Sequence, residues 1–210
     1  MVRRSVAALG VIGGVLAALG AANLYQRATT DEIPSTVVAR LDDMELRRYP
    51  SLVRVETVAD SETEAFRRLF RYITGSNEGG DAIAMTTPVE VTGRGTEIPM
   101  TAPVEIEADD RDAVRMAFYL PSTYDAASAP RPTDEAVTLG TVPERTLAVR
   151  RFSGRPTDGR VTRETEHLLT TLDAAGVAVA GRPFFMGYDA PWTLPFLRRN
   201  EVAVEVEAER

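Results

Sequence analysis

The sequence contains no cysteine and no lysine, and it has a single histidine, His167. Without cysteine the chain can form no disulfide, no thiolate nucleophile and no cysteine metal site. A Ser/His/Asp arrangement is not recognisable, and the HExxH, P-loop and GxGxxG motifs do not occur. We therefore predict no catalytic residues and identify no metal ligand from the sequence.

Arginine supplies all the basic charge apart from His167. Beyond residue 27 there are 21 Arg against 31 Asp and Glu, a net charge of −10. This charge repels phosphate backbones, so nucleic acid is not an expected partner. An acidic surface without lysine suits a halophile, although a GC-rich genome also favours arginine over lysine.

The N-terminal segment is the one long uncharged run. Ser5 to Gln26 spans 22 residues after Arg3-Arg4, and a helix of that length reaches roughly 33 Å, about the hydrocarbon thickness of a bilayer. We predict a transmembrane helix within residues 1–27, with its basic end in the cytoplasm and the domain outside. The alternative is a signal peptide cleaved near Gly20-Ala21-Ala22, which would leave a secreted protein.

Residues 28–35 contain Thr, Asp, Glu and Pro and are predicted to be a linker, followed by a domain over residues 36–210. Alternating apolar residues predict strands over 37–41, 44–49 and 52–58. The pattern then becomes helical. Ser61 and Glu64 form a capping box, and Gly75 stands where a C-terminal cap belongs. The expected apolar stripe of this first helix consists of Phe66, Leu69, Phe70 and Ile73.

A short phrase occurs twice after this helix. Residues 85–91 read MTTPVEV, and residues 100–106 read MTAPVEI. The glycine turn between the phrases predicts a hairpin in which they pair as equivalent strands. Glu90 and Glu105 would then face one another on a solvated side of the sheet. A metal site between them is the less economical interpretation.

The second half of the sequence repeats the pattern of the first. Strands predicted over 137–142 and 146–152 flank Pro143, as 44–49 and 52–58 flank Pro50. Each pair precedes a helix, and the second helix ends at Gly176. Further strands are predicted over 114–120, 183–188 and 201–206. These patterns predict an α+β fold with internal pseudo-two-fold duplication: a curved antiparallel sheet or distorted antiparallel β-barrel with two flanking helices.

Several of these phrases together resemble the SOUL/haem-binding protein family. They are MELRRYP (44–50), AFRRLFRYITGSN (65–77), the two MTxPVE phrases, MAFYLPSTY (116–124) and GYDAPWTLPFLRRNEV (187–202). The resemblance covers about residues 36–207. It implies a distorted antiparallel barrel with two helices. It also implies binding of haem or a related tetrapyrrole in a shallow apolar groove beside the first helix.

The resemblance also directs attention to individual residues. Basic residues in the matching helix are implicated in family members, which makes Arg68 and Arg71 candidates for pairing with haem propionates; the alternative is a solvated basic face. Tyr188 and Trp192 could wall a planar ligand or simply pack in the closing loop. Arg198 could bind a propionate or pair with a local carboxylate, and Met85 could ligate iron or fill the core. His167 lies away from the apolar stripe of its helix and is expected on the surface, so the axial ligand is not identified.

The leading hypothesis is a membrane-tethered binder of haem or another tetrapyrrole. One alternative is an enzyme that acts on haem or a small hydrophobic molecule in the same groove. Another is an interaction module whose groove stays empty and whose acidic surface binds a protein partner. The sequence does not choose among these alternatives.

Overall fold

The structure is a computed structural model, and it describes residues 30–92, 113–190 and 193–207. Within these residues lie two α-helices, α2 (Glu62–Ile73) and α3 (Asp158–Ala174), and a 3₁₀ turn, η1 (Pro195–Leu197). Nine strands form one antiparallel sheet. They are β2 (Thr36–Leu41), β3 (Met44–Tyr49), β4 (Leu52–Ala59), β6 (Val89–Thr92), β7 (Val114–Tyr119), β8 (Val137–Val142), β9 (Arg145–Phe152), β10 (Phe184–Gly187) and β11 (Asn200–Val206).

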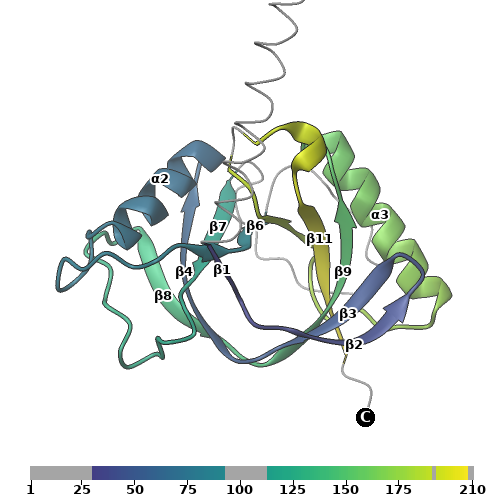
Figure 1. Cartoon of the computed structure of the whole chain (residues 1–210), viewed down its shortest axis with the longest axis horizontal. Coiled ribbons are helices and arrows are strands. Elements are labelled where there is room, and N and C mark those ends of the chain that lie inside the picture. The colour runs from purple at the N-terminus through teal and green to yellow at the C-terminus, as the bar shows by residue number, and fades with distance from the viewer. Residues whose placement is uncertain (1–29, 93–112, 191–192, 208–210) are drawn as a thin grey trace, which may run out of the picture.

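The sheet is curved but open. Its strand order is β2-β3-β9-β11-β10-β6-β7-β4-β8, and Figure 1 shows β2 and β8 on opposite sides of the molecule. Among the described residues no hydrogen bonds join these two edge strands. The α+β class, the two helices and the large antiparallel sheet are therefore confirmed. A closed barrel is not, because closure requires the two edges to pair.

The strand order also displays the predicted repetition. One half of the sheet reads β8-β4-β7-β6, and the other half reads β3-β9-β11-β10. In each series the first strand comes from one half of the sequence and the other three come from the other half. As a result β3 pairs with β9, and β8 pairs with β4. Each of β4 and β9 is followed by one helix. This exchange of strands joins the two halves into one sheet.

The predicted caps of both helices are present. The Ser61 hydroxyl accepts a hydrogen bond from the Glu64 amide at 3.3 Å. Gly75, with φ of 118°, and Gly176, with φ of 69°, adopt the left-handed conformation at the helix ends that favours glycine. The predicted stripe of α2 is correct only in part. Leu69 and Ile73 are buried, whereas Phe66 and Phe70 are 36% and 44% exposed.

Both helices cover the same face of the sheet. Leu69 of α2 packs in a cluster with Phe118, and Leu168 of α3 packs in another with Val204. A third cluster, which includes Tyr49, Tyr119 and Tyr188, is formed by residues that alternate with these along the strands. We call the side of the sheet that carries this third cluster the inner face.

The first MTxPVE phrase does not form the predicted hairpin strand. Val89–Val91 of β6 pair with β7 along one edge and with β10 along the other. Both hydrogen-bonding edges are therefore occupied by strands other than the second phrase. Residues 100–106 lie outside the described residues. The error arose because sequence similarity identified an equivalent segment but not the strand beside it.

The chain enters the domain along the inner face. Within the predicted linker, β1 (Asp31–Glu32) pairs in parallel with β5 (Thr86–Thr87), and Ile33 packs into the inner-face cluster. In the part of the chain that the structure describes, no helix has both the length and the apolarity to cross a membrane. The predicted anchor, residues 1–27, lies outside that part.

Candidate functional site

The outward surface of α2 brings together three arginines. Arg68 donates to the Val58 carbonyl at 3.0 Å and pairs with the Glu64 carboxylate. Arg71 forms an ion pair with Asp134 at 3.3 Å between Nη2 and Oδ2. Arg67 is exposed, and among the described residues its guanidinium has no hydrogen-bond or ion-pair partner. The sequence analysis selected Arg68 and Arg71; Arg67 is the α2 arginine for which the described residues supply no partner.

An aromatic pair lies beside these arginines. The Phe66 and Phe70 rings are stacked, with centroids 5.8 Å apart and an interplanar angle of 15°. Phe66 also meets the edge of Phe118 at 5.4 Å, which anchors the pair to the core. At 100° per residue, Phe70 and Arg67 are about 60° apart around the helix. The exposed aromatic flank therefore borders the basic face directly.

A shallow depression of about 300 Å³ lies along this basic face. The described residues that line it are Ser61, Thr63, Glu64, Arg67, Arg68 and Arg71. Its lining is polar, so this depression is not the apolar groove expected beside the first helix, and that groove stays a prediction. An apolar surface is formed by the adjacent Phe66–Phe70 flank, because the buried stripe of α2 is centred on Ala65, Leu69 and Tyr72.

The remaining predicted site residues do not converge on α2. Met85 is half-buried and packs against the cluster beneath α2. Tyr188 is buried on the inner face, where the guanidinium of Arg199 lies 3.8 Å from its ring centroid. The Arg198 side chain donates to the Thr193 carbonyl at 2.9 Å. Trp192 lies outside the described residues. Arg68, Arg71 and Met85 thus belong to one side of the sheet, and Tyr188 to the other.

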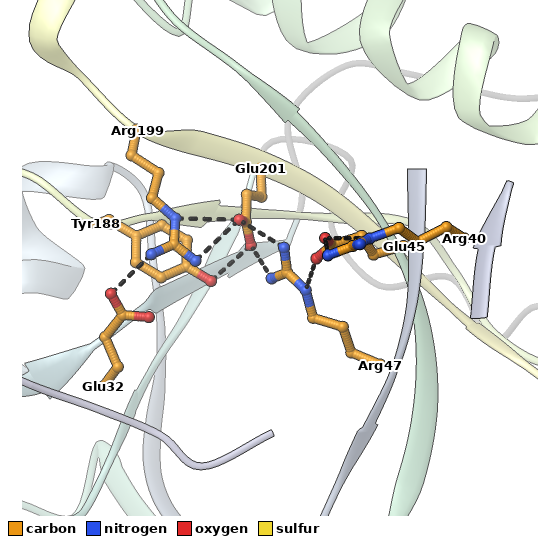
Figure 2. A network of polar contacts seen from close by, with 7 residues as sticks. All are labelled: Glu32, Arg40, Glu45, Arg47, Tyr188, Arg199 and Glu201. Atoms are coloured by element: carbon orange, nitrogen blue, oxygen red, sulfur yellow. Dashed lines mark hydrogen bonds and ion pairs between the residues drawn. The ribbon is translucent and has the colours of Figure 1, made fainter. Parts of the chain in front are cut away.

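Tyr188 belongs to a buried polar network centred on Glu201 (Figure 2). Glu201 is fully buried, and its carboxylate accepts hydrogen bonds from Arg47 at 2.9 and 3.2 Å, from Tyr188 at 2.6 Å and from Arg199 at 3.1 Å. Arg199 reaches on to Glu32 of β1 at 2.7 Å. These bonds connect β3 and β11 to the segment by which the chain enters the domain.

Burial and charge shift the proton affinities in this network in consistent directions. Burial raises the pKa of Tyr188, and the Glu201 carboxylate raises it further, so the phenol remains a hydrogen-bond donor. Burial by itself lowers the pKa of Arg47, but the same carboxylate more than offsets this and the pKa is raised. The network therefore consists of two guanidinium cations and a neutral phenol directed at one carboxylate. Its geometry indicates a structural role.

A second buried carboxylate corrects the interpretation of Glu90. It was expected on a solvated face, but it is only 7% exposed. Tyr119 donates to it at 2.5 Å, Arg145 at 3.1 Å and Arg54 at 3.3 Å. The surrounding tyrosine and arginines come from β4, β7 and β9. Only the register of these strands brings them to Glu90, so single-strand patterns could not reveal the burial.

Metal ligation receives no support from the described side chains. No group of three or more His, Asp or Glu residues among them could hold a metal ion. Glu105, the proposed partner of Glu90, lies outside the described residues. His167 is exposed on α3, as predicted. Its role as a surface residue is confirmed.

Comparison with known proteins places this fold among relatives. The family model for "SOUL heme-binding protein" matches residues 30–205. Heme-binding protein 1 of Mus musculus is 26% identical over 146 residues, which cover 69% of this chain and 71% of the mouse protein. Heme-binding protein 1 of Xenopus tropicalis is 27% identical over 143 residues, covering 68% and 70%.

Solved structures show the same fold at low identity. The EcmrR C-terminal domain is 12% identical, with a TM-score of 0.56 over 78% of this chain and 96% of that one. A hydrolase from Listeria innocua is also 12% identical, with a TM-score of 0.53 over 81% and 94%. At this identity the likeness concerns the fold alone.

Proposed function

Because the chain belongs to the SOUL heme-binding protein family, we propose that it binds haem or a related tetrapyrrole on the outward surface of α2. The Phe66–Phe70 pair, together with Arg67, which is exposed and has no partner among the described residues, is the observation that carries the proposal. A tetrapyrrole is a flat apolar disc with carboxylate substituents, and this surface offers both complementary features side by side.

The arginines of α2 contribute unequally to this site. Arg67 can pair with a propionate without breaking an existing contact. Arg71 is 52% exposed and would exchange its pair with Asp134, which costs little because exposed ion pairs contribute about 0–1 kcal/mol. Arg68 is held by Val58 and Glu64 and acts mainly to position the helix surface. Arg67 and Arg71 are therefore the proposed propionate partners.

The fit concerns the porphyrin plane and its carboxylates, and it does not extend to iron. Haem iron takes His, Cys, Met or Tyr as protein ligands. The chain has no cysteine, and its one histidine lies on α3. Met85 packs near the base of α2 and remains the candidate thioether from the sequence analysis. Binding by stacking and ion pairing predicts that iron-free protoporphyrin also binds.

The proposal is tested by titrating hemin into a chain that begins at residue 30. A Soret change that saturates near one equivalent supports it, and Arg67→Ala/Arg71→Ala should weaken binding roughly two- to thirtyfold, from about 0.2–1 kcal/mol per ion pair. Arg163→Ala, an exposed arginine on α3, is the matched control and should leave binding unchanged. Absence of saturation at micromolar hemin contradicts the proposal. Progressive loss of bound absorbance would indicate turnover rather than storage.

We further propose that residues 1–27 tether this domain to a membrane, with the domain on the extracytoplasmic side. The uncharged run from Ser5 to Gln26 and the preceding Arg3-Arg4 support this orientation. Protease added to intact cells and to spheroplasts tests it. Degradation of the domain in spheroplasts supports the orientation, and protection there contradicts it.

A further inference from the structure

The turn η1 holds a large apolar side chain in solvent. Phe196 is 69% exposed, although Leu194 and Leu197 on either side of it are half-buried. The turn itself is fixed in place. Gly154 donates its amide to the Pro195 carbonyl at 3.0 Å, and Asn200 donates its side chain to the Gly154 carbonyl at 3.0 Å. Phe196 is thus presented by a braced turn at the edge of the domain.

An exposed cation follows the glycine that is hydrogen-bonded to this turn. Arg155 follows Gly154 directly, is exposed, and among the described residues has no side-chain partner. An exposed aromatic ring next to an arginine is the combination that lies at membrane–water interfaces, because the ring enters the boundary of the acyl chains while the cation pairs with lipid phosphates. Arg155 is an exposed positive charge on a chain whose net charge is negative.

The turn also lies close to the point where the chain enters the domain. Arg199, three residues after Phe196, forms an ion pair with Glu32 at 2.7 Å. Four residues, 28–31, separate the predicted anchor from Glu32, and the five steps from residue 27 to Glu32 span at most about 18 Å. The polar region of a bilayer adds roughly 5–8 Å on each side. The edge of the domain that carries η1 is therefore within reach of the membrane surface.

We propose that the tip formed by Phe196, Leu194 and Arg155 inserts into the interfacial layer of the bilayer that holds the anchor. This inference rests on the membrane tether proposed above. Figure 1 shows that α2 and α3 both begin at the edge of the domain where η1 lies, and Phe66 is little more than one turn into α2. Insertion of the tip therefore orients the candidate tetrapyrrole surface close to the lipid, where amphiphilic porphyrins accumulate.

The absence of cysteine allows a direct test on the full chain. Phe196→Cys and the control Glu144→Cys are each labelled with the environment-sensitive fluorophore NBD and reconstituted in phosphatidylcholine/phosphatidylglycerol vesicles. Glu144 is exposed and precedes β9, whose far end pairs with Asn200 beside η1. The eight residues of β9 separate Glu144 from the end of the strand beside η1 by roughly 25 Å. The label itself replaces the apolar ring at position 196.

The label at position 196 should fluoresce at least twofold more strongly in vesicles than in detergent-free buffer, and nitroxide-labelled lipid should quench it. The label at position 144 should instead be quenched by aqueous iodide. If the chain co-floats with vesicles but both labels respond only to iodide, the tip proposal is overturned while the tether stands. If the unlabelled chain does not co-float, the tether and the tip proposal both fail, and haem binding by the domain is unaffected.

Discussion

Removal of the Glu201 carboxylate should destabilise the domain more than any change at an exposed ion pair. In Glu201→Ala, the Arg47 guanidinium, whose side chain is 11% exposed, loses both of its bonds to Glu201. Breaking a buried ion pair of this kind costs about 3–5 kcal/mol, and we expect the lower end of that range because Arg47 keeps its bond to Glu45 at 2.8 Å. Since small domains are stable by roughly 5–15 kcal/mol, this loss is a large fraction of the total.

The same network contains its own control. Arg40 pairs with Glu45 at the solvent end of the network (Figure 2), and its side chain is 73% exposed. Arg40→Ala should cost at most about 1 kcal/mol. The assay is urea unfolding of both variants in a chain that begins at residue 30. Their free energies of unfolding are compared with the same dependence on urea concentration.

The double variant Glu201→Met/Arg47→Met makes the test sharper. Replacing both charges by apolar side chains of similar volume removes the cation that Glu201→Ala leaves without its buried partner, so part of the loss should be recovered relative to Glu201→Ala. A Glu201→Ala variant that unfolds within about 1 kcal/mol of Arg40→Ala would refute the reasoning. Such a result would mean that water reaches Arg47.

Two pH-dependent predictions follow from the shifted proton affinities. Burial raises the pKa of Tyr188 and of Tyr119, so the stability they contribute is complete below the unfolded value of about 10 and is lost as the pH rises. Tyr188→Phe should therefore flatten the fall in the free energy of unfolding, measured with urea, between pH 9 and 11. An unchanged slope against pH would contradict this. The hydrogen bond from Arg47 lowers the pKa of Glu45, so the stability that Glu45 contributes is present above the ordinary value of 4.5 and is lost as the pH falls. In the same assay, the free energy of unfolding of Glu45→Gln should fall less between pH 5 and 3 than that of the wild type. An equal fall would argue against this pair.

Local signals in the sequence predicted most of the secondary structure. The β3 and β8 boundaries coincide with the predicted 44–49 and 137–142, because alternation and the following proline act within a few residues. The N-cap at Ser61 and the glycine ends of both helices are equally local. The repetition of the pattern around Pro50 and Pro143 also anticipated the two-fold strand order.

Features that depend on partners distant in the sequence could not be predicted in this way. Whether Glu90 faces water or the side chains of Tyr119, Arg145 and Arg54 depends on the register of β4, β6, β7 and β9 across the sheet. The location of Tyr188 on the inner face, beneath Arg199, has the same origin. On α2 the residue types were recognised, but which arginine lacks a partner among the described residues depends on Val58 and Asp134 outside the helix as well as on Glu64 within it.

The most direct test of the account is the hemin affinity of Phe66→Ala/Phe70→Ala measured against wild type and Arg163→Ala. Loss of an exposed stacking surface worth about 1–2 kcal/mol should weaken binding roughly five- to thirtyfold, whereas the α3 control should stay within twofold of wild type. Circular dichroism of the folded variants ensures that the comparison reports binding. Hemin affinity that is the same in all three proteins would contradict the assignment of the tetrapyrrole site to α2.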